Sequence, residues 1–138
     1  MQLKVEHLTN IRVRYGETDQ MGYCYYGNYA QYFEVGRVEA LRELGLSYKE
    51  LEQKGIMLPV AHFEVKYIKP ALYDDLLTIK TTITQLKGAQ LFFEYEIHNE
   101  AQQLISQAKT TLVFVQKESM KPTSPPPAFT QLIESYAV

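Results

Sequence analysis

The feature that most constrains the fold is one long amphipathic segment followed by several alternating ones. Across residues 28–44, apolar residues recur every three or four positions and charged residues fall mostly between them, the pattern of a helix with one apolar face. Gly45 suits the end of this helix. Because one such helix needs a sheet to cover it, the sequence predicts an α+β fold in which a curved antiparallel sheet wraps a central helix.

The flanking segments show the two-residue period of β-strands. The short connections at residues 87–88 and 99–102 favour an antiparallel meander for the last four strands, and open sheet edges favour a homodimer whose sheets join side by side. The expected strands are residues 11–15, 60–68, 77–83, 91–98 and 104–116.

Two further segments complete the predicted order. Ser47 and Glu50 have the spacing of a capping box, so a short helix is expected from there to Gly55. Residues 122–127 contain four prolines, which block regular structure, and residues 128–136 suit either a terminal helix or a docking arm.

Composition excludes several classes of protein. The 138 residues suit one domain, residues 1–138, and 46% hydrophobic with 22% charged residues is a soluble globular composition. A net charge of −2 without a basic stripe disfavours nucleic-acid binding, and no apolar run approaches the roughly 18 residues of a membrane span. The single cysteine, Cys24, permits no internal disulfide, so a reducing cytoplasm is expected.

Common catalytic motifs are absent. The chain has no G-x-S-x-G, H-E-x-x-H, G-K-[ST] phosphate loop or G-x-G-x-x-G, and its histidines lack the spacing of a helical metal pair, so neither a metal nor a cofactor is expected. Cys24 lies before the long helix and is a candidate nucleophile, but packing within the loop is the favoured interpretation because no histidine is close in sequence.

The loop of residues 15–29 carries the candidate chemistry. The first amides of a helix have no intrahelical acceptor and can hold a developing oxyanion. Asp19 could then attack a carbonyl or take a proton from water, and Gly22 and Gly27 would permit close approach of backbone and substrate. On spacing alone, the interpretation of Asp19 as a turn residue or cap is favoured.

In these segments the sequence resembles the hotdog-fold thioesterases, in the branch that contains 4-hydroxybenzoyl-CoA thioesterase and the YbgC-like acyl-CoA thioesterases. The resemblance covers roughly residues 8–117 and reverses the preference for a simple turn. The matching residues are Tyr15-x-Glu17-Thr18-Asp19, Gly22, Asn28-Tyr29, Tyr32-Phe33-Glu34 with Arg37, Val65-x-Tyr67, Pro70 and Asp74-Asp75.

The resemblance implies a hotdog fold with about five strands and hydrolysis of a small acyl- or aromatic-CoA thioester. Asp19 matches the catalytic carboxylate, as nucleophile or general base, and the backbone N–H of Tyr26 matches the donor that polarises the carbonyl. Coenzyme A would belong to the substrate and lie across a subunit boundary, in a homodimer that assembles to a tetramer. The implied substrate-binding residues are Tyr15, Gly22, Tyr25, Gly27, Asn28 and Tyr29.

One position separates the two branches. Many YbgC-like members carry histidine where this chain has Tyr26, whereas the hydroxybenzoyl enzymes carry tyrosine there. The resemblance therefore implies a backbone donor and no imidazole at this position, and the tyrosine points to an aromatic acyl group. Tyr23, Tyr25 and Tyr26 suit either an apolar acyl pocket or packing of the helix start. Both interpretations stay open.

Other charged residues have alternative roles. Glu34 and Arg37, three apart on the helix, suit an ordinary surface ion pair, and Arg37 is interpreted as a structural residue that helps subunit contacts. Lys66, Lys69 and Lys87 are candidates for the CoA phosphates or are simply solvated lysines.

Two other functions compete with hydrolysis. A non-catalytic acyl-binding module of the same fold would bind without turnover. A related hydratase or dehydratase would need a histidine on the central helix, and residues 28–44 contain none.

Overall fold

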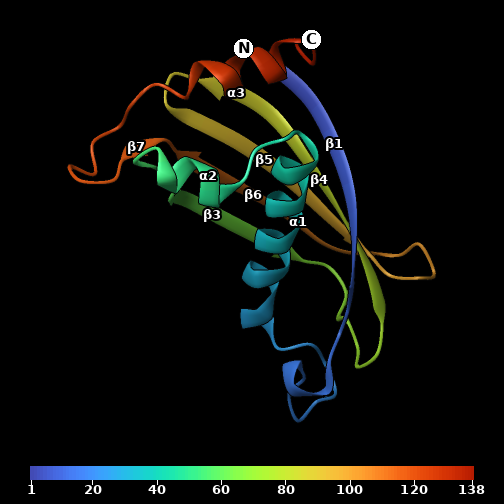
Figure 1. The fold of residues 1–138 in the computed structure, drawn as a ribbon. Helices are drawn as coiled ribbons and strands as arrows, with labels where there is room; N and C mark the ends of the chain where they lie inside the picture. Colours follow the sequence, from blue (N-terminus) through green and yellow to red (C-terminus); the bar gives the residue numbers. More distant parts are fainter.

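The computed structural model describes residues 1–138. A five-stranded antiparallel sheet curves around one long helix, α1, which confirms the α+β class, the central helix and the number of strands (Figure 1). The elements in chain order are β1 (Gln2–Arg12), the 3₁₀ turns η1 (Tyr15–Glu17) and η2 (Tyr26–Asn28), α1 (Tyr29–Glu43), α2 (Tyr48–Gln53), β2 (Ile56–Met57), β3 (Val60–Tyr67), β4 (Leu76–Lys87), β5 (Gln90–His98), β6 (Leu104–Val113), β7 (Val115–Gln116) and α3 (Pro127–Glu134).

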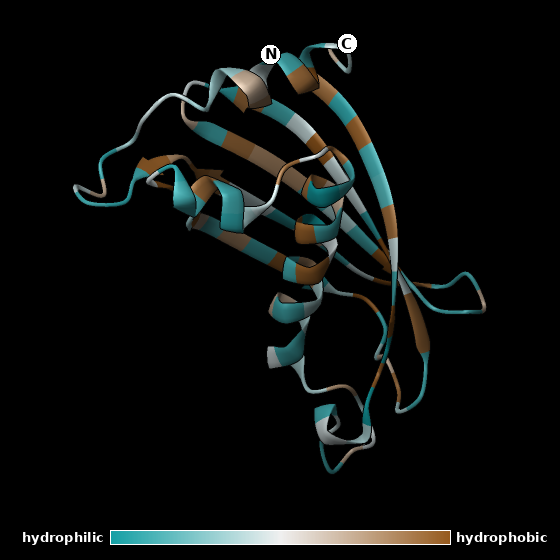
Figure 2. Ribbon diagram, viewed as in Figure 1, coloured by the Kyte–Doolittle hydropathy of each residue, from teal (hydrophilic) through white to brown (hydrophobic).

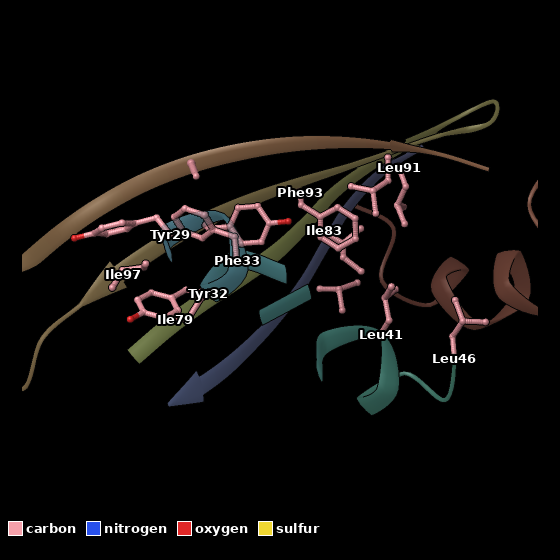
Figure 3. Close-up of a cluster of buried hydrophobic side chains, with 14 of the residues drawn as sticks. Tyr29, Tyr32, Phe33, Leu41, Leu46, Ile79, Ile83, Leu91, Phe93 and Ile97 are labelled. Carbon is pink, nitrogen blue, oxygen red and sulfur yellow. The ribbon is translucent and has the colours of Figure 1, made fainter. Parts of the chain in front are cut away.

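The core lies between α1 and the sheet. Along β4 and β5 nearly every second residue is buried, and bands of apolar and polar residues alternate along these strands in Figure 2. Phe33 and Leu41 of α1 belong to one buried cluster with Ile83 and Phe93 of the sheet, and each of the four is at most 1% exposed (Figure 3). Burial of each such side chain contributes about 1.5–3 kcal/mol, so this cluster holds the helix on the sheet.

The strand order departs from a simple meander. The order is β1-β4-β5-β6-β3, so β4, β5 and β6 form the expected meander but β3 pairs with β6 at the far edge. The prediction that β3 neighbours β4 was wrong because β1 occupies that edge of β4, with Val5 opposite Ile83 and Arg12 opposite Leu76. The connection after β3 therefore crosses beside the helix start, where Cys24 N donates to Ala71 O at 2.7 Å.

Two strand boundaries also differ from the prediction. The first strand was expected at residues 11–15, but β1 begins at Gln2 because Leu3 and Val5 already point into the core. The expected strand 104–116 is divided at Phe114, where β5 has ended: its amide donates to Ala89 O in the β4–β5 turn at 2.8 Å, and its carbonyl accepts from Thr123 N at 2.9 Å. Its last part, β7, pairs with β2.

The short helices agree with the sequence. Ser47 Oγ caps α2 by accepting from Glu50 N at 3.1 Å. The C-terminal segment forms the helix α3, which buries Phe129 and Ile133 completely, so it is part of the domain core. None of the helices is both long and apolar enough to cross a membrane.

Arg37 is not the surface residue that its spacing predicted. It is only 7% exposed, it forms no ion pair with Glu34, and its Nε has no hydrogen-bond partner. The hydroxyl groups of Tyr48 and Tyr95 lie near its guanidinium, and the Tyr48 hydroxyl likewise has no hydrogen-bond partner. The predicted surface pair is therefore wrong, because the helix turns this side chain toward α2 and β5.

Candidate active site

The chain between β1 and α1 folds back on itself just before the helix. Thr18 and Cys24 form an isolated antiparallel bridge, and Tyr25 N donates to Glu17 O at 2.8 Å. Because the two arms of the loop are paired, the turn that contains Asp19 is held to the same short hairpin that leads into α1. Asp19 and the start of the helix therefore belong to one hydrogen-bonded unit.

Asp19 occupies the tip of this loop. Its Oδ1 accepts from Met21 N at 2.9 Å and from Tyr23 N at 3.2 Å, so the carboxylate does cap its own turn. Gly22 closes the turn with φ of +79°, a conformation that favours glycine. Asp19 Oδ2 accepts no hydrogen bond, and the side chain is partly exposed. One carboxylate oxygen thus orients the group while the other is free to react.

The helix start supplies unpaired donors. Asn28 N donates to Tyr25 O and Tyr29 N to Tyr26 O, but the N–H groups of Tyr26 and Gly27 donate to no acceptor in the chain. They stand immediately before α1, where aligned peptide dipoles favour negative charge. Tyr26 N is the donor that the sequence predicted, and Gly27 N is a second one beside it.

Exposed tyrosine rings surround these amides. Tyr25 and Tyr26 are 48% and 64% exposed, with ring centroids 4.8 Å apart. Tyr67 at the end of β3 meets Tyr26 edge-on at 6.3 Å and donates from its hydroxyl to Tyr26 O at 3.3 Å. Tyr23 is also exposed, so none of the three loop tyrosines is buried as packing for the helix start. Sequence reasoning gave Tyr67 no role, although it belonged to a matching motif.

The two remaining tyrosines of the predicted substrate site have opposite environments. Tyr15 is 79% exposed and meets Tyr73 edge-on at 5.6 Å. Tyr29 is 3% exposed and accepts weakly from Ala71 N at 3.4 Å. Burial raises the pKa of Tyr29 to about 12. Tyr29 therefore supports the site from inside the domain.

Glu17 is the buried acid of the loop, and sequence reasoning did not single it out. Its side chain is 12% exposed, and Oε1 accepts from Tyr32 Oη and from Arg14 N, both at 2.9 Å. Its backbone oxygen accepts from Tyr25 N at 2.8 Å and from Asn28 Nδ2 at 2.7 Å. The only signal in the sequence was its place two residues before Asp19 in the matching motif.

Cys24 has the character of a packed residue. It is 5% exposed, and its Sγ lies 3.3 Å from Tyr32 Oη. Burial raises the pKa of the thiol, because it disfavours the thiolate that a nucleophile needs. No three His, Cys, Asp or Glu side chains are grouped as ligands of a metal ion.

The candidate lysines lie at two ends of the sheet. Lys66 and Lys69 are exposed near the end of β3, whereas Lys87 is the last residue of β4, at the end of the sheet opposite the loop. None of the three forms an ion pair. Lys66 points to the outer face of the sheet, away from Tyr67, so of the three only Lys69, two residues before the Ala71 carbonyl that accepts from Cys24 N, lies close to the loop.

A hollow of the surface lies away from the loop. It has a volume of about 520 Å³ on the outer face of the sheet and contains no residue of the loop. Its lining includes alternating lysine and glutamate side chains, namely Lys66, Lys80, Lys109, Glu64, Glu94 and Glu96.

Comparisons with known proteins agree with these observations. The family model described as the thioesterase-like superfamily matches residues 13–133. The chain is 39% identical to the putative acyl-CoA thioesterase YneP of Bacillus subtilis, over 81% of each protein. It is 34% identical to the acyl-CoA thioester hydrolase YbgC of Escherichia coli, over 84% of this chain and 87% of that protein.

A solved structure supports the same relationship. The DHNA-CoA thioesterase of Staphylococcus aureus superimposes with a TM-score of 0.89 at 34% identity, over 92% of this chain and 87% of that one. The hotdog fold that the motifs implied is thereby confirmed. The chain belongs to the thioesterase-like superfamily.

Proposed function

We propose that this chain hydrolyses the thioester of a small acyl- or aromatic acyl-CoA, with Asp19 as the reacting carboxylate. The chain is an acyl-CoA thioester hydrolase by its relationship to YneP and YbgC. The role of Asp19 rests on one observation: a carboxylate with a free oxygen shares a rigid loop with the unpaired N–H groups of Tyr26 and Gly27.

The reaction needs few groups. The thioester carbonyl oxygen accepts from Tyr26 N, which polarises the carbon, and attack places negative charge on that oxygen. As a general base, Asp19 takes a proton from water while the water oxygen bonds to the carbon; as a nucleophile, it forms an acyl anhydride that water then opens. In both routes the C–S bond breaks, CoA leaves as the thiolate and takes up a proton, and the acid is released.

The substrate class follows from the tyrosines. Tyr25, Tyr26 and Tyr67 present exposed rings beside the free amides, and aromatic pairs gain energy from edge-on and offset contacts. An aromatic or short acyl group suits this surface. The histidine of many YbgC-like members is absent at Tyr26, so no imidazole takes part there.

Assembly would complete the site. β3 is an edge strand whose outer side is unpaired, and it exposes Val60, Phe63 and Tyr67. Pairing of this edge with a second copy would cover these side chains and bring a second wall to the site beside Tyr67. A tetramer of two such dimers in the cytoplasm, with Lys69 near the CoA phosphates, completes the proposal.

A panel of CoA thioesters tests the function. The wild-type protein is expected to release thiol from at least one short or aromatic member. Asn at position 19 still offers an oxygen to Met21 N and Tyr23 N, so Asp19→Asn should keep the loop but lower kcat at least about 100-fold.

The matched control is Asp75→Asn. Asp75 Oδ2 accepts from Leu72 N at 2.8 Å and caps the neighbouring turn in the same way, without a role in the reaction. It should leave kcat unchanged. Equal rates for wild type and Asp19→Asn would refute the role of Asp19, and saturable binding without turnover of any thioester would identify a binding module instead.

A further inference from the structure

Glu17 connects the two halves of the proposed chemistry. Tyr25 N and Asn28 Nδ2 both donate to its backbone oxygen, at 2.8 and 2.7 Å. These two donors bracket Tyr26 and Gly27, whose own N–H groups are free. The position of the free amides is therefore set on both sides by one carbonyl group.

The side chain of Glu17 fixes that carbonyl in turn. Oε1 accepts from Arg14 N, at the end of β1, and from the hydroxyl of Tyr32, one turn into α1. A carboxylate that is 12% exposed is costly to bury unless hydrogen bonds compensate, and here they do. Strand, loop and helix are thus joined at one residue.

Tyr32 is suited to be a permanent donor. Burial is the main cause that raises the pKa of its hydroxyl above the usual range, and the neighbouring Cys24 and Glu17 raise it further. The hydroxyl therefore keeps its proton at every pH at which an enzyme of this kind works. Its hydrogen bond to Glu17 Oε1 is a structural contact that does not switch.

We propose that Glu17 is a positioning residue: through Tyr32 and Asn28 it holds Asp19 and the free amides of Tyr26 and Gly27 in register across the thioester. This inference rests on the proposed function and adds a second carboxylate to it. Glu17 itself does not meet the substrate, because its carboxylate is turned toward α1 and already accepts two hydrogen bonds.

Two substitutions at Glu17 separate position from charge. Gln keeps an oxygen that can accept from Arg14 N and Tyr32 Oη, and loses only an exposed contact of 3.5 Å with Arg14 Nη2. Glu17→Gln should therefore keep a kcat close to wild type. Glu17→Ala removes both acceptors and should lower kcat about 10- to 100-fold, with a smaller change in KM, as expected when reacting groups are displaced by a fraction of an ångström.

Tyr32→Phe provides a variant with an intact core. It removes only the hydroxyl, so the chain should fold, and kcat should fall in the same direction as in Glu17→Ala. In the double variant the two losses should not add, because they break the same contact. Amide resonances of Tyr26 and Gly27 should shift in Glu17→Ala and Tyr32→Phe but not in Glu17→Gln.

Each outcome decides. A Glu17→Gln enzyme as slow as Glu17→Ala would show that the charge of Glu17 takes part in the reaction, which overturns a positioning role. Wild-type kcat in Tyr32→Phe and Glu17→Ala would do the same. Absence of thioesterase activity in the wild type would refute the proposed function alone, because the amide shifts would still report whether Glu17 holds the loop.

Discussion

The start of α1 and its inner turns differ in almost every respect. At the start, rings of Tyr25 and Tyr26 face solvent, two backbone amides have no partner, and hydrogen bonds hold the chain. Along the inner turns, Phe33 and Leu41 are buried against the sheet, and apolar packing holds the helix. The comparison teaches that the inner turns of α1 contribute stability, whereas the proposed reactive groups lie in the turn that precedes the helix. Substitutions in the two regions should therefore affect different measurements.

The largest effect on stability is expected at the inner turns. Phe33 is completely buried, with its ring 4.9 Å from that of Tyr95, so Phe33→Ala should lower the free energy of unfolding by about 3–5 kcal/mol. Tyr15→Ala, at the beginning of the loop that precedes α1, removes a ring that is 79% exposed. This substitution should change the free energy of unfolding by less than about 0.5 kcal/mol. Urea unfolding measures both. Similar losses of unfolding free energy in the two variants would show that the two regions contribute equally to stability.

Glycines with positive φ allow a sharper comparison. Gly22 in the loop and Gly45 after α1 have φ of +79° and +95°, and a Cβ at either would meet nothing within 4 Å. Gly22→Ala and Gly45→Ala should therefore each cost about 1–2 kcal/mol of stability from backbone strain alone. Only Gly22→Ala should also lower kcat, because it strains the turn that orients Asp19. Equal kcat values in the two variants would show that the turn at Gly22 has no role in the reaction.

Much of the inner region could be predicted from the sequence. The period of apolar residues in 28–44 gave α1 to within one residue at each end, because burial of one helix face requires that period. The strand order could not be predicted in the same way. The local sequence of residues 60–68 does not indicate that β1 pairs with the edge of β4. The position of β3 beside β6 therefore depends on the pairing of the whole sheet.

The residues of the candidate site likewise fall into those that the sequence could predict and those that it could not. Asp19 and the amide of Tyr26 could be named because a motif carries them, but Glu17 and Tyr67 act through contacts over 15 and 41 residues of sequence. The prediction for Arg37 was also wrong, because helical spacing gives its distance to Glu34 but does not show that its side chain is buried. Long-range contacts are therefore what sequence patterns lacked in both regions.

The smallest expected effect concerns pH at the boundary between the two regions. Tyr29 is the first residue of α1, and its pKa is about 12 in the folded chain, raised by burial, against an ordinary value of about 10 in the unfolded one. The unfolded chain therefore loses this proton first, so the contribution of Tyr29 to stability is complete below pH 10 and is lost as pH rises from 10 through 12.

Tyr29→Phe keeps the buried ring and removes the titrating hydroxyl. Unfolding free energies measured in urea at intervals from pH 9 to about pH 11.5 should fall less steeply in Tyr29→Phe than in the wild type. Some slope should persist, since burial also raises the pKa of Tyr48 and Tyr95. Identical slopes would mean that water reaches the Tyr29 hydroxyl, in which case the exposed region extends into the first turn of α1 and Tyr29 joins Tyr25 and Tyr26 on the substrate side.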